Sequence, residues 1–143
     1  MTALSSETVH ASTVSIGGRA VLISGRPGSG KSDLALRLID RGAVLVSDDY
    51  TIVTRSGKRL LASAPETIRG RIEIRGVGLV EMPNETAVPV ALVVEIDEPV
   101  PRMPEPGRTR LIANIAVPLF ALAPHEASAP IKVERVLKTL ATA

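Results

Sequence analysis

The chain has 143 residues, of which 45% are apolar and 22% are charged, and its formal net charge is +2. This length suits one domain with a sizeable hydrophobic core, so we expect residues 1–143 to form a single domain. A surplus of two positive charges is too small to indicate a nucleic-acid or membrane partner. Tyr50 and Phe120 are the only aromatic residues, which argues against base-stacking recognition of single-stranded nucleic acid.

The sequence predicts a cytoplasmic protein with no membrane-spanning segment. Residues 1–13 have neither the basic start nor the apolar centre of a signal peptide. The longest apolar stretch, residues 112–123, is interrupted by Asn114 and Pro118 and is too short to span a bilayer. The chain has no cysteine, which excludes disulfides and thiolate metal sites.

Two strands and a helix are predicted in the first third of the chain. Residues 9–16 mix β-branched and small polar side chains, which indicates an edge strand, and the glycines at 17–18 indicate a hairpin turn. Residues 19–24 form a continuous apolar run, as in a fully buried strand. From Lys31 the apolar spacing becomes helical, and Gly42 marks the end of that helix. Its apolar face carries Leu34, Ala35, Leu38 and Ile39.

The middle of the chain is predicted to be mostly extended. Strands are expected at residues 43–47, 50–54 and 58–62. Residues 65–70 indicate a short helical turn or a loop. Residues 72–80 carry two glycines in an apolar frame, which predicts a strand interrupted by a bulge or a close backbone approach.

The last third is predicted to combine two strands, a long loop and a helix. Strands are expected at residues 88–96 and 115–122, with an irregular, proline-rich loop at 98–110 between them. Residues 131–140 have the spacing of an amphipathic helix. Because strands outnumber helices, we predict an α/β protein with a mixed, strand-rich sheet rather than a regular βαβ array.

Residues 25–32 match the Walker A pattern G-x-x-x-x-G-K-[ST] in full. Glycines allow backbone N–H groups to converge on phosphate oxygens, and the helix that follows directs its positive N-terminal end at the same anion. Lys31 is expected to reach the β- and γ-phosphates, and the Ser32 hydroxyl to bind Mg²⁺. The buried strand before the loop and the helix after it distinguish it from a chance glycine-rich turn. Nucleotide phosphates are therefore predicted to contact Gly25, Arg26, Pro27, Gly28, Ser29, Gly30, Lys31 and Ser32.

A pair of carboxylates, Asp48 and Asp49, follows the second predicted buried strand. P-loop proteins often place an acidic residue at such a strand end to hold Mg²⁺. On an extended chain the two side chains would point to opposite sides, so that one would face the metal and the other a substrate hydroxyl. An ordinary acidic turn is the alternative interpretation.

Other charged residues and the histidines are less informative by themselves. Arg71, Glu73 and Arg75 alternate with isoleucines and share one face of an extended segment, for which a solvated strand face is the simpler interpretation. His10 is interpreted as a half-exposed strand residue. His125 lies in a segment that contains prolines, and the sequence indicates no partner for it.

Taken together, three segments resemble the catalytic domain of the bacterial HPr kinase/phosphorylase family. They are the phosphate loop with His10 upstream of it, residues 41–49 (RGAVLVSDD) and, most specifically, residues 68–79 (IRGRIEIRGVGL), which are similar to the family pattern IRGxxEIRGxGI. The resemblance implies a P-loop fold like that of phosphoenolpyruvate carboxykinase. It also implies an ATP-dependent kinase that phosphorylates a serine of HPr, the phosphocarrier protein of the sugar phosphotransferase system.

The resemblance further implies roles for individual residues. It places His10 in the active site and Lys31 on the nucleotide phosphates, and it places Ser32 and Glu73 at Mg²⁺. One aspartate of the pair would accept the proton of the substrate serine.

Of this pair, Asp49 is favoured as the proton acceptor and Asp48 for the metal side. Arg75 would neutralise charge on the transferred phosphoryl group. Arg102 is the best match to a further catalytic arginine, with Arg108 as the second choice.

The chain also differs from typical members of this family. Only nine residues precede His10, and residues 123–130 replace a segment associated with phosphorolysis. These features resemble a short, alphaproteobacterial form without the N-terminal domain and favour kinase over phosphorylase activity. The family resemblance also implies a hexamer. Two other functions share the loop: a small-molecule kinase, which would need additional lid helices, and a nucleotide-gated switch that binds ATP without transfer.

Overall fold

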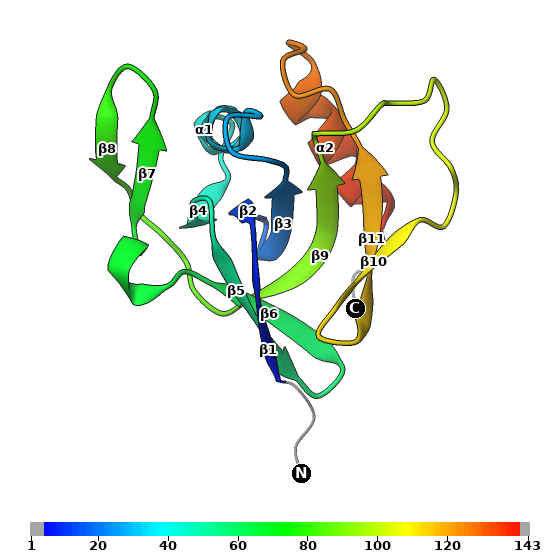
Figure 1. Ribbon diagram of the computed structural model, residues 1–143, viewed down its shortest axis with the longest axis horizontal. Coiled ribbons are helices and arrows are strands. Elements are labelled where there is room, and N and C mark those ends of the chain that lie inside the picture. Colours follow the sequence, from blue (N-terminus) through cyan, green and yellow to red (C-terminus); the bar gives the residue numbers. More distant parts are fainter. Residues whose placement is uncertain (1–4, 141–143) are drawn as a thin grey trace.

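The computed structural model describes residues 5–140, and strands account for most of its regular structure (Figure 1). The first half contains β1 (Ser6–Val9), β2 (Ala11–Ile16), β3 (Arg19–Ser24), α1 (Lys31–Asp40), β4 (Val44–Ser47), β5 (Thr51–Ser56), β6 (Arg59–Ser63) and a short 3₁₀ helix, η1 (Glu66–Ile68). The second half contains β7 (Arg71–Ile74), β8 (Gly78–Glu81), β9 (Val88–Glu95), β10 (Thr109–Ile112), β11 (Ile115–Ala121) and α2 (Ala129–Thr139). The strands predicted at 19–24, 43–47, 50–54, 58–62, 88–96 and 115–122 and both helices are confirmed.

One mixed sheet runs in the order β1-β5-β6-β9-β3-β2-β4, and β11 pairs with both β9 and β10. Strand β9 lies parallel to β3 and to β11, whereas the other pairs in this sheet are antiparallel. The prediction of a mixed, strand-rich sheet is therefore confirmed. Strands β7 and β8 form a separate hairpin, which stands beside α1 (Figure 1).

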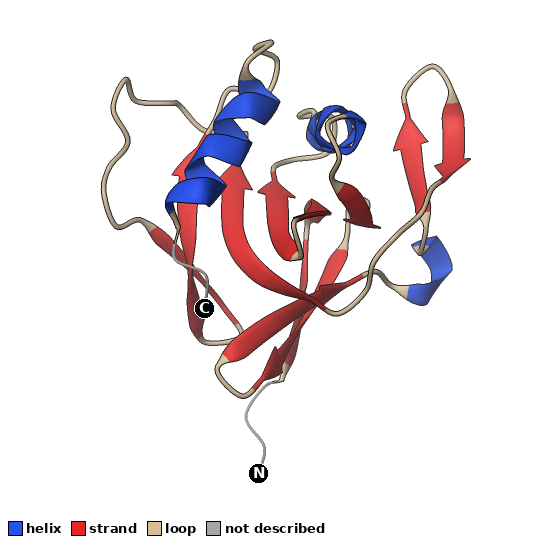
Figure 2. Ribbon diagram, turned by 180° about the vertical axis from the view of Figure 1, so that it is seen from behind, coloured by secondary structure: helices blue, strands red, loops and turns tan. Residues whose placement is uncertain are grey.

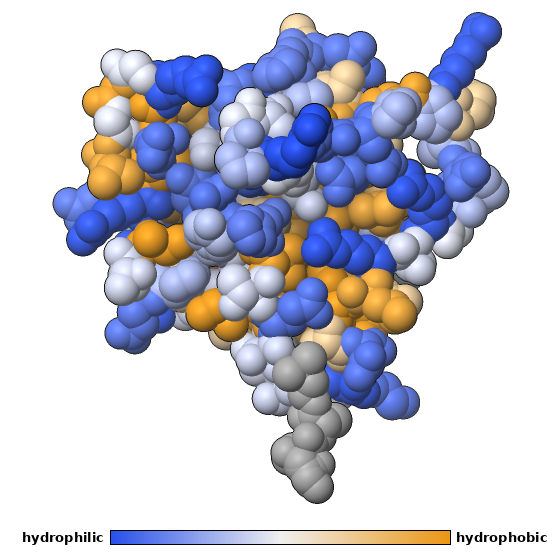
Figure 3. Space-filling view, in the orientation of Figure 1, coloured by the Kyte–Doolittle hydropathy of each residue, from blue (hydrophilic) through white to orange (hydrophobic). Residues whose placement is uncertain are grey.

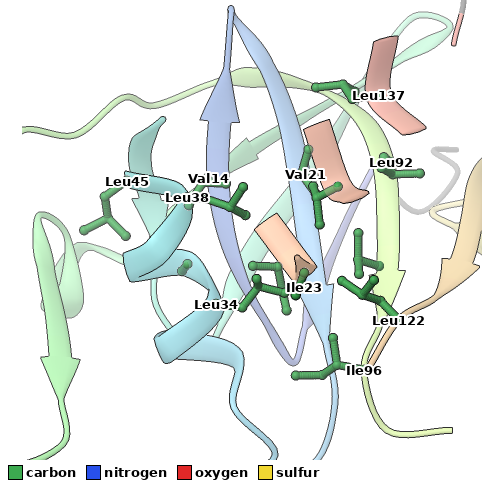
Figure 4. Packing of buried hydrophobic residues seen from close by; sticks show 14 of the residues in the cluster. Val14, Val21, Ile23, Leu34, Leu38, Leu45, Leu92, Ile96, Leu122 and Leu137 are labelled. Carbon is green, nitrogen blue, oxygen red and sulfur yellow. The ribbon is translucent and has the colours of Figure 1, made fainter. Parts of the chain in front are cut away.

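The sheet buries a hydrophobic cluster on each face. Side chains alternate along β3, so that Val21 and Ile23 join one cluster while Ala20 and Leu22 join the other. Both helices cover the first face (Figure 2), and their apolar side chains interlock there with those of the sheet (Figure 4). On the second face, the layer formed by β1, β5 and β6 and the β10–β11 hairpin close over the sheet.

Helix α1 depends on this packing, because a helix of ten residues is marginal by itself. Leu34, Ala35 and Leu38 are buried, as their spacing predicts. The helix ends in a Schellman motif: Gly42 adopts φ 111° and donates its N–H to the carbonyl of Ile39, and the next N–H bonds Leu38. The predicted stop at Gly42 is thus confirmed, with its cause in backbone geometry.

The prediction of one edge strand at residues 9–16 is wrong. The segment forms two strands separated at His10, and β2 lies inside the sheet between β3 and β4. Its small polar side chains are buried rather than solvent-facing, since the Thr13 hydroxyl lies 2.7 Å from that of Thr51. Internal hydrogen bonds of Ser12 and Thr13 make these two polar residues compatible with an interior strand.

The prediction of a bulged strand at residues 72–80 is also wrong, because this segment turns back on itself. The N–H of Val77 bonds the carbonyl of Ile74 at 2.9 Å, and Gly76 adopts φ 84°. These are the features of a tight turn, so the segment becomes the β7–β8 hairpin. Within residues 5–140, neither helix is long and apolar enough to cross a membrane.

Candidate active site

The phosphate loop connects the end of β3 to the start of α1. Gly28 and Gly30 adopt φ values of 81° and 109°, which favour glycine. A Cβ atom at Gly25 would lie 2.5 Å from the Ser29 hydroxyl and 3.0 Å from Ile96, so a larger residue here would displace these side chains. The first N–H groups of α1 have no partner within the helix, and Gly30, as the N-cap, has no side chain to bond them. The loop therefore presents unpaired donors at the positive end of a helix, as an anion site requires.

Lys31 lies against this loop with 4% of its surface exposed. Its ammonium group donates hydrogen bonds to the carbonyls of Gly25 (2.9 Å) and Arg26 (3.1 Å) and lies 3.3 Å from a carboxylate oxygen of Asp49. These acceptors match the three donors of a lysine ammonium group. The lysine is thus held as a positive charge between the phosphate loop and the acidic pair.

Asp48 connects four elements of the fold through its carboxylate. Its Oδ1 accepts hydrogen bonds from the hydroxyls of Ser12 (2.9 Å) and Ser32 (2.6 Å), and its Oδ2 accepts one from the backbone N–H of Glu73 (2.9 Å). Strand β2, the start of α1 and the β7–β8 hairpin therefore meet at the end of β4.

Asp49 departs from the extended geometry that its position after a strand predicts. Its φ of 67° lies in the left-handed region, where few residues other than glycine are found. The hydroxyl of Ser12 accepts its backbone N–H at 3.0 Å and helps to hold this conformation. The extended geometry assumed for this pair is therefore absent at Asp49, and both aspartates line one cleft.

This cleft has a volume of about 470 Å³ and runs across the N-terminus of α1. The hairpin contributes Glu73 and Arg75 to the same side as the acidic pair, and the loop after β11 contributes His125 beside Gly30. The other residues that line the cleft are Pro27, Gly28, Lys31, Ser32, Asp33, Leu36, Asp48, Asp49 and Ile74. The arrangement combines a phosphate-binding loop, four carboxylates and cations within one cleft, and these are the groups that phosphoryl transfer requires.

A second contact fixes the loop from outside the cleft. The guanidinium of Arg26 binds both carboxylate oxygens of Asp97, which follows β9, and the backbone N–H of Arg26 bonds the same carboxylate at 3.3 Å. The hydrogen bond from Arg26 lowers the pKa of Asp97 and correspondingly raises the pKa of Arg26. Asp97 therefore stays ionised at neutral pH, and the start of the phosphate loop is anchored to the end of a central strand.

Comparison with known proteins places this site in a family. The model of the HPr Serine kinase C-terminal domain matches residues 2–88, which include the phosphate loop and the acidic pair. The chain belongs to this family. Its match ends at β9, so the loop that carries His125 lies outside the family segment.

The HPr kinase/phosphorylase of Chloroherpeton thalassium is 46% identical over 74 residues, which are 51% of this chain and 22% of that protein. The one from Caldanaerobacter subterraneus subsp. tengcongensis is 37% identical over 99 residues, which are 64% of this chain and 32% of that protein. The chain thus spans about a quarter to a third of the curated relatives it matches.

One solved structure matches nearly the whole chain. The Hpr(Ser) kinase/phosphatase from Coxiella burnetii superposes with a TM-score of 0.79 at 30% identity, and the match covers 93% of this chain and 89% of that one. The fold of this HPr kinase domain therefore extends beyond the segment that the family model covers.

Two residues that the family resemblance places in the active site lie outside the main cleft. His10 is exposed, and its ring meets that of Tyr50 edge-on with centroids 4.7 Å apart. It borders a second cleft of about 560 Å³ on the other side of the phosphate loop, together with Gly25 and Arg26. Arg102 is exposed and lines neither cleft, and Arg108 forms an ion pair with Glu98.

Three residues of the site were not predicted from the sequence: Ser12, Asp97 and His125. Ser12 is a small polar residue in a strand, and Asp97 precedes a proline-rich loop, so neither has a distinguishing pattern. His125 is one of only two histidines. A histidine in a loop is a recognisable signal, but its neighbour Gly30 is distant in the chain, so the sequence does not reveal their contact.

Proposed function

We propose that the chain is an ATP- and Mg²⁺-dependent protein-serine kinase whose substrate is HPr, in regulation of the phosphotransferase system. The observation that carries this proposal is the meeting of Lys31, Ser32 and both aspartates in one cleft. The names of the relatives support HPr as the protein that receives the phosphoryl group. Fold and site together favour transfer over simple binding, because a nucleotide-binding module needs no second carboxylate.

The residues of the cleft fit a magnesium ion that arrives with the nucleotide. The Ser32 hydroxyl and the carboxylates of Asp48 and Glu73 offer the hard oxygen ligands that Mg²⁺ prefers. Within residues 5–140 there is no cluster of three or more His, Cys, Asp or Glu side chains that would hold a metal by itself. This agrees with the usual pattern, in which Mg²⁺ binds one or two carboxylates and the substrate phosphates. When bound, the ion would neutralise charge on the β- and γ-phosphates.

Asp49 is the best candidate for the proton acceptor. Its side chain is 47% exposed, whereas Asp48 is buried and already accepts three hydrogen bonds. In the proposed reaction the serine oxygen bonds the γ-phosphorus, the bond from that phosphorus to the bridging oxygen of ADP breaks, and the serine proton passes to Asp49. Lys31 and Arg75 supply positive charge to the transferred group.

Several finer assignments are part of this proposal. Residues 1–143 would form one catalytic domain of the phosphoenolpyruvate carboxykinase-like and alphaproteobacterial type, located in the cytoplasm. The protein would assemble as a hexamer. We expect the kinase direction to dominate, with phosphorolysis weak or lost. His10 and Arg102 would act on the substrate side once HPr is bound.

The proposal is tested by transfer of labelled phosphate from ATP to purified HPr, with wild type and Asp49→Asn. We expect Asp49→Asn to bind ATP with a Kd within about threefold of wild type, and to transfer at least about 100-fold more slowly, as loss of a general base predicts. Asp40→Asn, an exposed aspartate at the end of α1, is the matched control and should transfer normally.

Transfer by Asp49→Asn at the wild-type rate would show that the role of Asp49 is wrong. Tight ATP binding by wild type with no transfer to HPr would favour the nucleotide-gated switch. Transfer to a small hydroxyl compound in a screen of acceptors, but not to HPr, would favour a small-molecule kinase.

A further inference from the structure

The loop after β11 brings His125 against the last glycine of the phosphate loop. A Cβ atom at Gly30 would lie 3.1 Å from Cε1 of His125 and 3.7 Å from Cβ of Pro124. The imidazole is exposed and lines the cleft of about 470 Å³. It therefore borders the proposed nucleotide site with its ring accessible to a ligand.

The position of this ring is set by helix α1 itself. The guanidinium of Arg37 donates hydrogen bonds to the carbonyls of Pro124 and Glu126, the residues on either side of His125. Arg37 is in turn oriented by Asp33, one turn earlier on the helix, at 3.1 Å. The same helix that begins at the phosphate loop thus holds the backbone around His125, so the ring is placed relative to any ligand on the loop.

The remaining residues of the cleft define the direction of a bound nucleotide. In a loop of this pattern the lysine reaches the β- and γ-phosphates, and backbone N–H groups hold the α- and β-phosphates. Lys31 lies 3.3 Å from Asp49, so the γ-phosphate end belongs beside the carboxylates. The α-phosphate and the nucleoside must then extend away from the carboxylates, across the start of α1. His125 adjoins Gly30 at the start of α1, where its side chain can contact the α-phosphate and the nucleoside.

His125 is also the only residue with a planar ring among those that line the cleft within the described part of the chain. Bases bind well to flat side chains, because stacking needs only a π face and no particular pattern of hydrogen-bond donors. We propose that His125 forms the nucleoside subsite and stacks on the base of the bound nucleotide. This inference rests on the proposed nucleotide-dependent function and adds the residue that contacts the base.

The test compares ATP with inorganic tripolyphosphate, which has the same phosphate chain without a nucleoside. Kd values of both are measured by calorimetry at one excess of Mg²⁺ for wild type, His125→Ala, His125→Phe and Glu126→Gln. Glu126→Gln is the control, since this neighbour is exposed and its side chain pairs with Lys132. Thermal unfolding of each variant checks that it is folded.

We expect His125→Ala to raise the Kd for ATP roughly five- to 100-fold, the range of one base–ring stack, and to leave that for tripolyphosphate unchanged. His125→Phe should keep most of the ATP affinity, and Glu126→Gln should behave as wild type.

Equal weakening of both ligands in His125→Ala would overturn the inference, because the histidine would then contact phosphate. An unchanged Kd for ATP would overturn it as well. If wild type binds neither ligand, the proposed function itself fails. If wild type binds ATP through His125 but does not phosphorylate HPr, the subsite stands and only the transfer function fails.

Discussion

Ser12 has a buried hydroxyl that bonds both aspartates of the site at once, one through its carboxylate and the other through its backbone N–H. It donates a hydrogen bond to Asp48 and accepts the backbone N–H of Asp49, which is held in a left-handed conformation. No charged residue would satisfy both partners, because the hydroxyl must act as donor and acceptor together. Ser12 is not among the residues that line the cleft but bonds two residues that do, so we regard it as a positioning residue.

We predict that Ser12→Ala destabilises the protein by about 1–3 kcal/mol, because it leaves polar groups unpaired. It should also slow phosphoryl transfer by roughly tenfold or more, since small displacements of reacting groups are costly. Ser12→Thr, which keeps the hydroxyl, should recover most of the transfer rate. Urea unfolding and the labelled transfer assay measure the two effects.

Ser15 on the same strand is the control for this prediction. It is also buried, but its hydroxyl has no hydrogen-bond partner among the described residues. Ser15→Ala should therefore be neutral or stabilising and should leave transfer unchanged. Equal losses of transfer in Ser12→Ala and Ser15→Ala would contradict the positioning role of Ser12.

At the scale of elements, the β7–β8 hairpin forms one side of the active-site cleft, although it does not belong to the main sheet. It is held by Ile72, which is fully buried in the cluster beneath α1, and by the bond from the Glu73 N–H to Asp48. Its far end exposes Val77 (72%) and Leu79 (69%). Hydrophobic surface is visible over this hairpin, at the upper left of Figure 3. Ile74 and Val80 pack against the same cluster, so apolar burial together with one hydrogen bond to Asp48 fixes the element that carries Glu73 and Arg75.

We predict that Ile72→Ala costs about 2–5 kcal/mol in the free energy of unfolding, the range for a buried isoleucine. Because Glu73 and Arg75 would lose their placement, transfer should fall more than ATP affinity does. Val77→Ser, at the exposed tip, should change stability by no more than about 0.5 kcal/mol. Urea unfolding, ATP titration and the transfer assay measure these effects.

Ile72→Val provides a milder test, with an expected cost of about 0.5–1.5 kcal/mol. If both variants at Ile72 lose stability but retain full transfer, the hairpin does not position the catalytic groups.

At the scale of the whole molecule, the phosphate loop connects to both hydrophobic clusters. Strand β3 precedes the loop and supplies side chains to the clusters on both faces of the sheet. Helix α1 follows the loop and packs against the cluster on one of these faces. Strand β9 lies beside β3 and anchors the loop through Asp97. A ligand that binds the folded loop alone should therefore stabilise the entire domain.

We predict that Mg·ATP at 100 times its Kd raises the free energy of unfolding by about 2.7 kcal/mol. The melting temperature should rise accordingly, and chelation of Mg²⁺ by EDTA should remove most of the increase. Lys31→Ala should abolish the shift, whereas Lys58→Ala, at an exposed turn, should retain it. Scanning calorimetry with and without nucleotide measures this shift in melting temperature. An equal shift in Lys31→Ala and wild type would mean that ATP binds elsewhere.

The features of this protein that are set by residues close together in the chain were predictable from the sequence. Helix α1 follows from the spacing of Leu34 and Leu38, and its end from Gly42. The phosphate loop follows from its glycines and Lys31, because backbone freedom and chain direction are local properties. Most strands were found for the same reason, as runs of apolar and β-branched residues between turns.

Tertiary structure alone decided which strands became neighbours and which side chains met. The small polar residues of β2 predicted an edge strand, yet Thr13 and Thr51 satisfy each other inside the sheet. Asp48 meets Ser12, 36 positions away, and Arg37 reaches Glu126, 89 positions away. Such contacts depend on strand order and register between distant segments, which local periodicity does not encode. The sequence by itself therefore determined the phosphate loop, and the packing of the sheet determined what surrounds it.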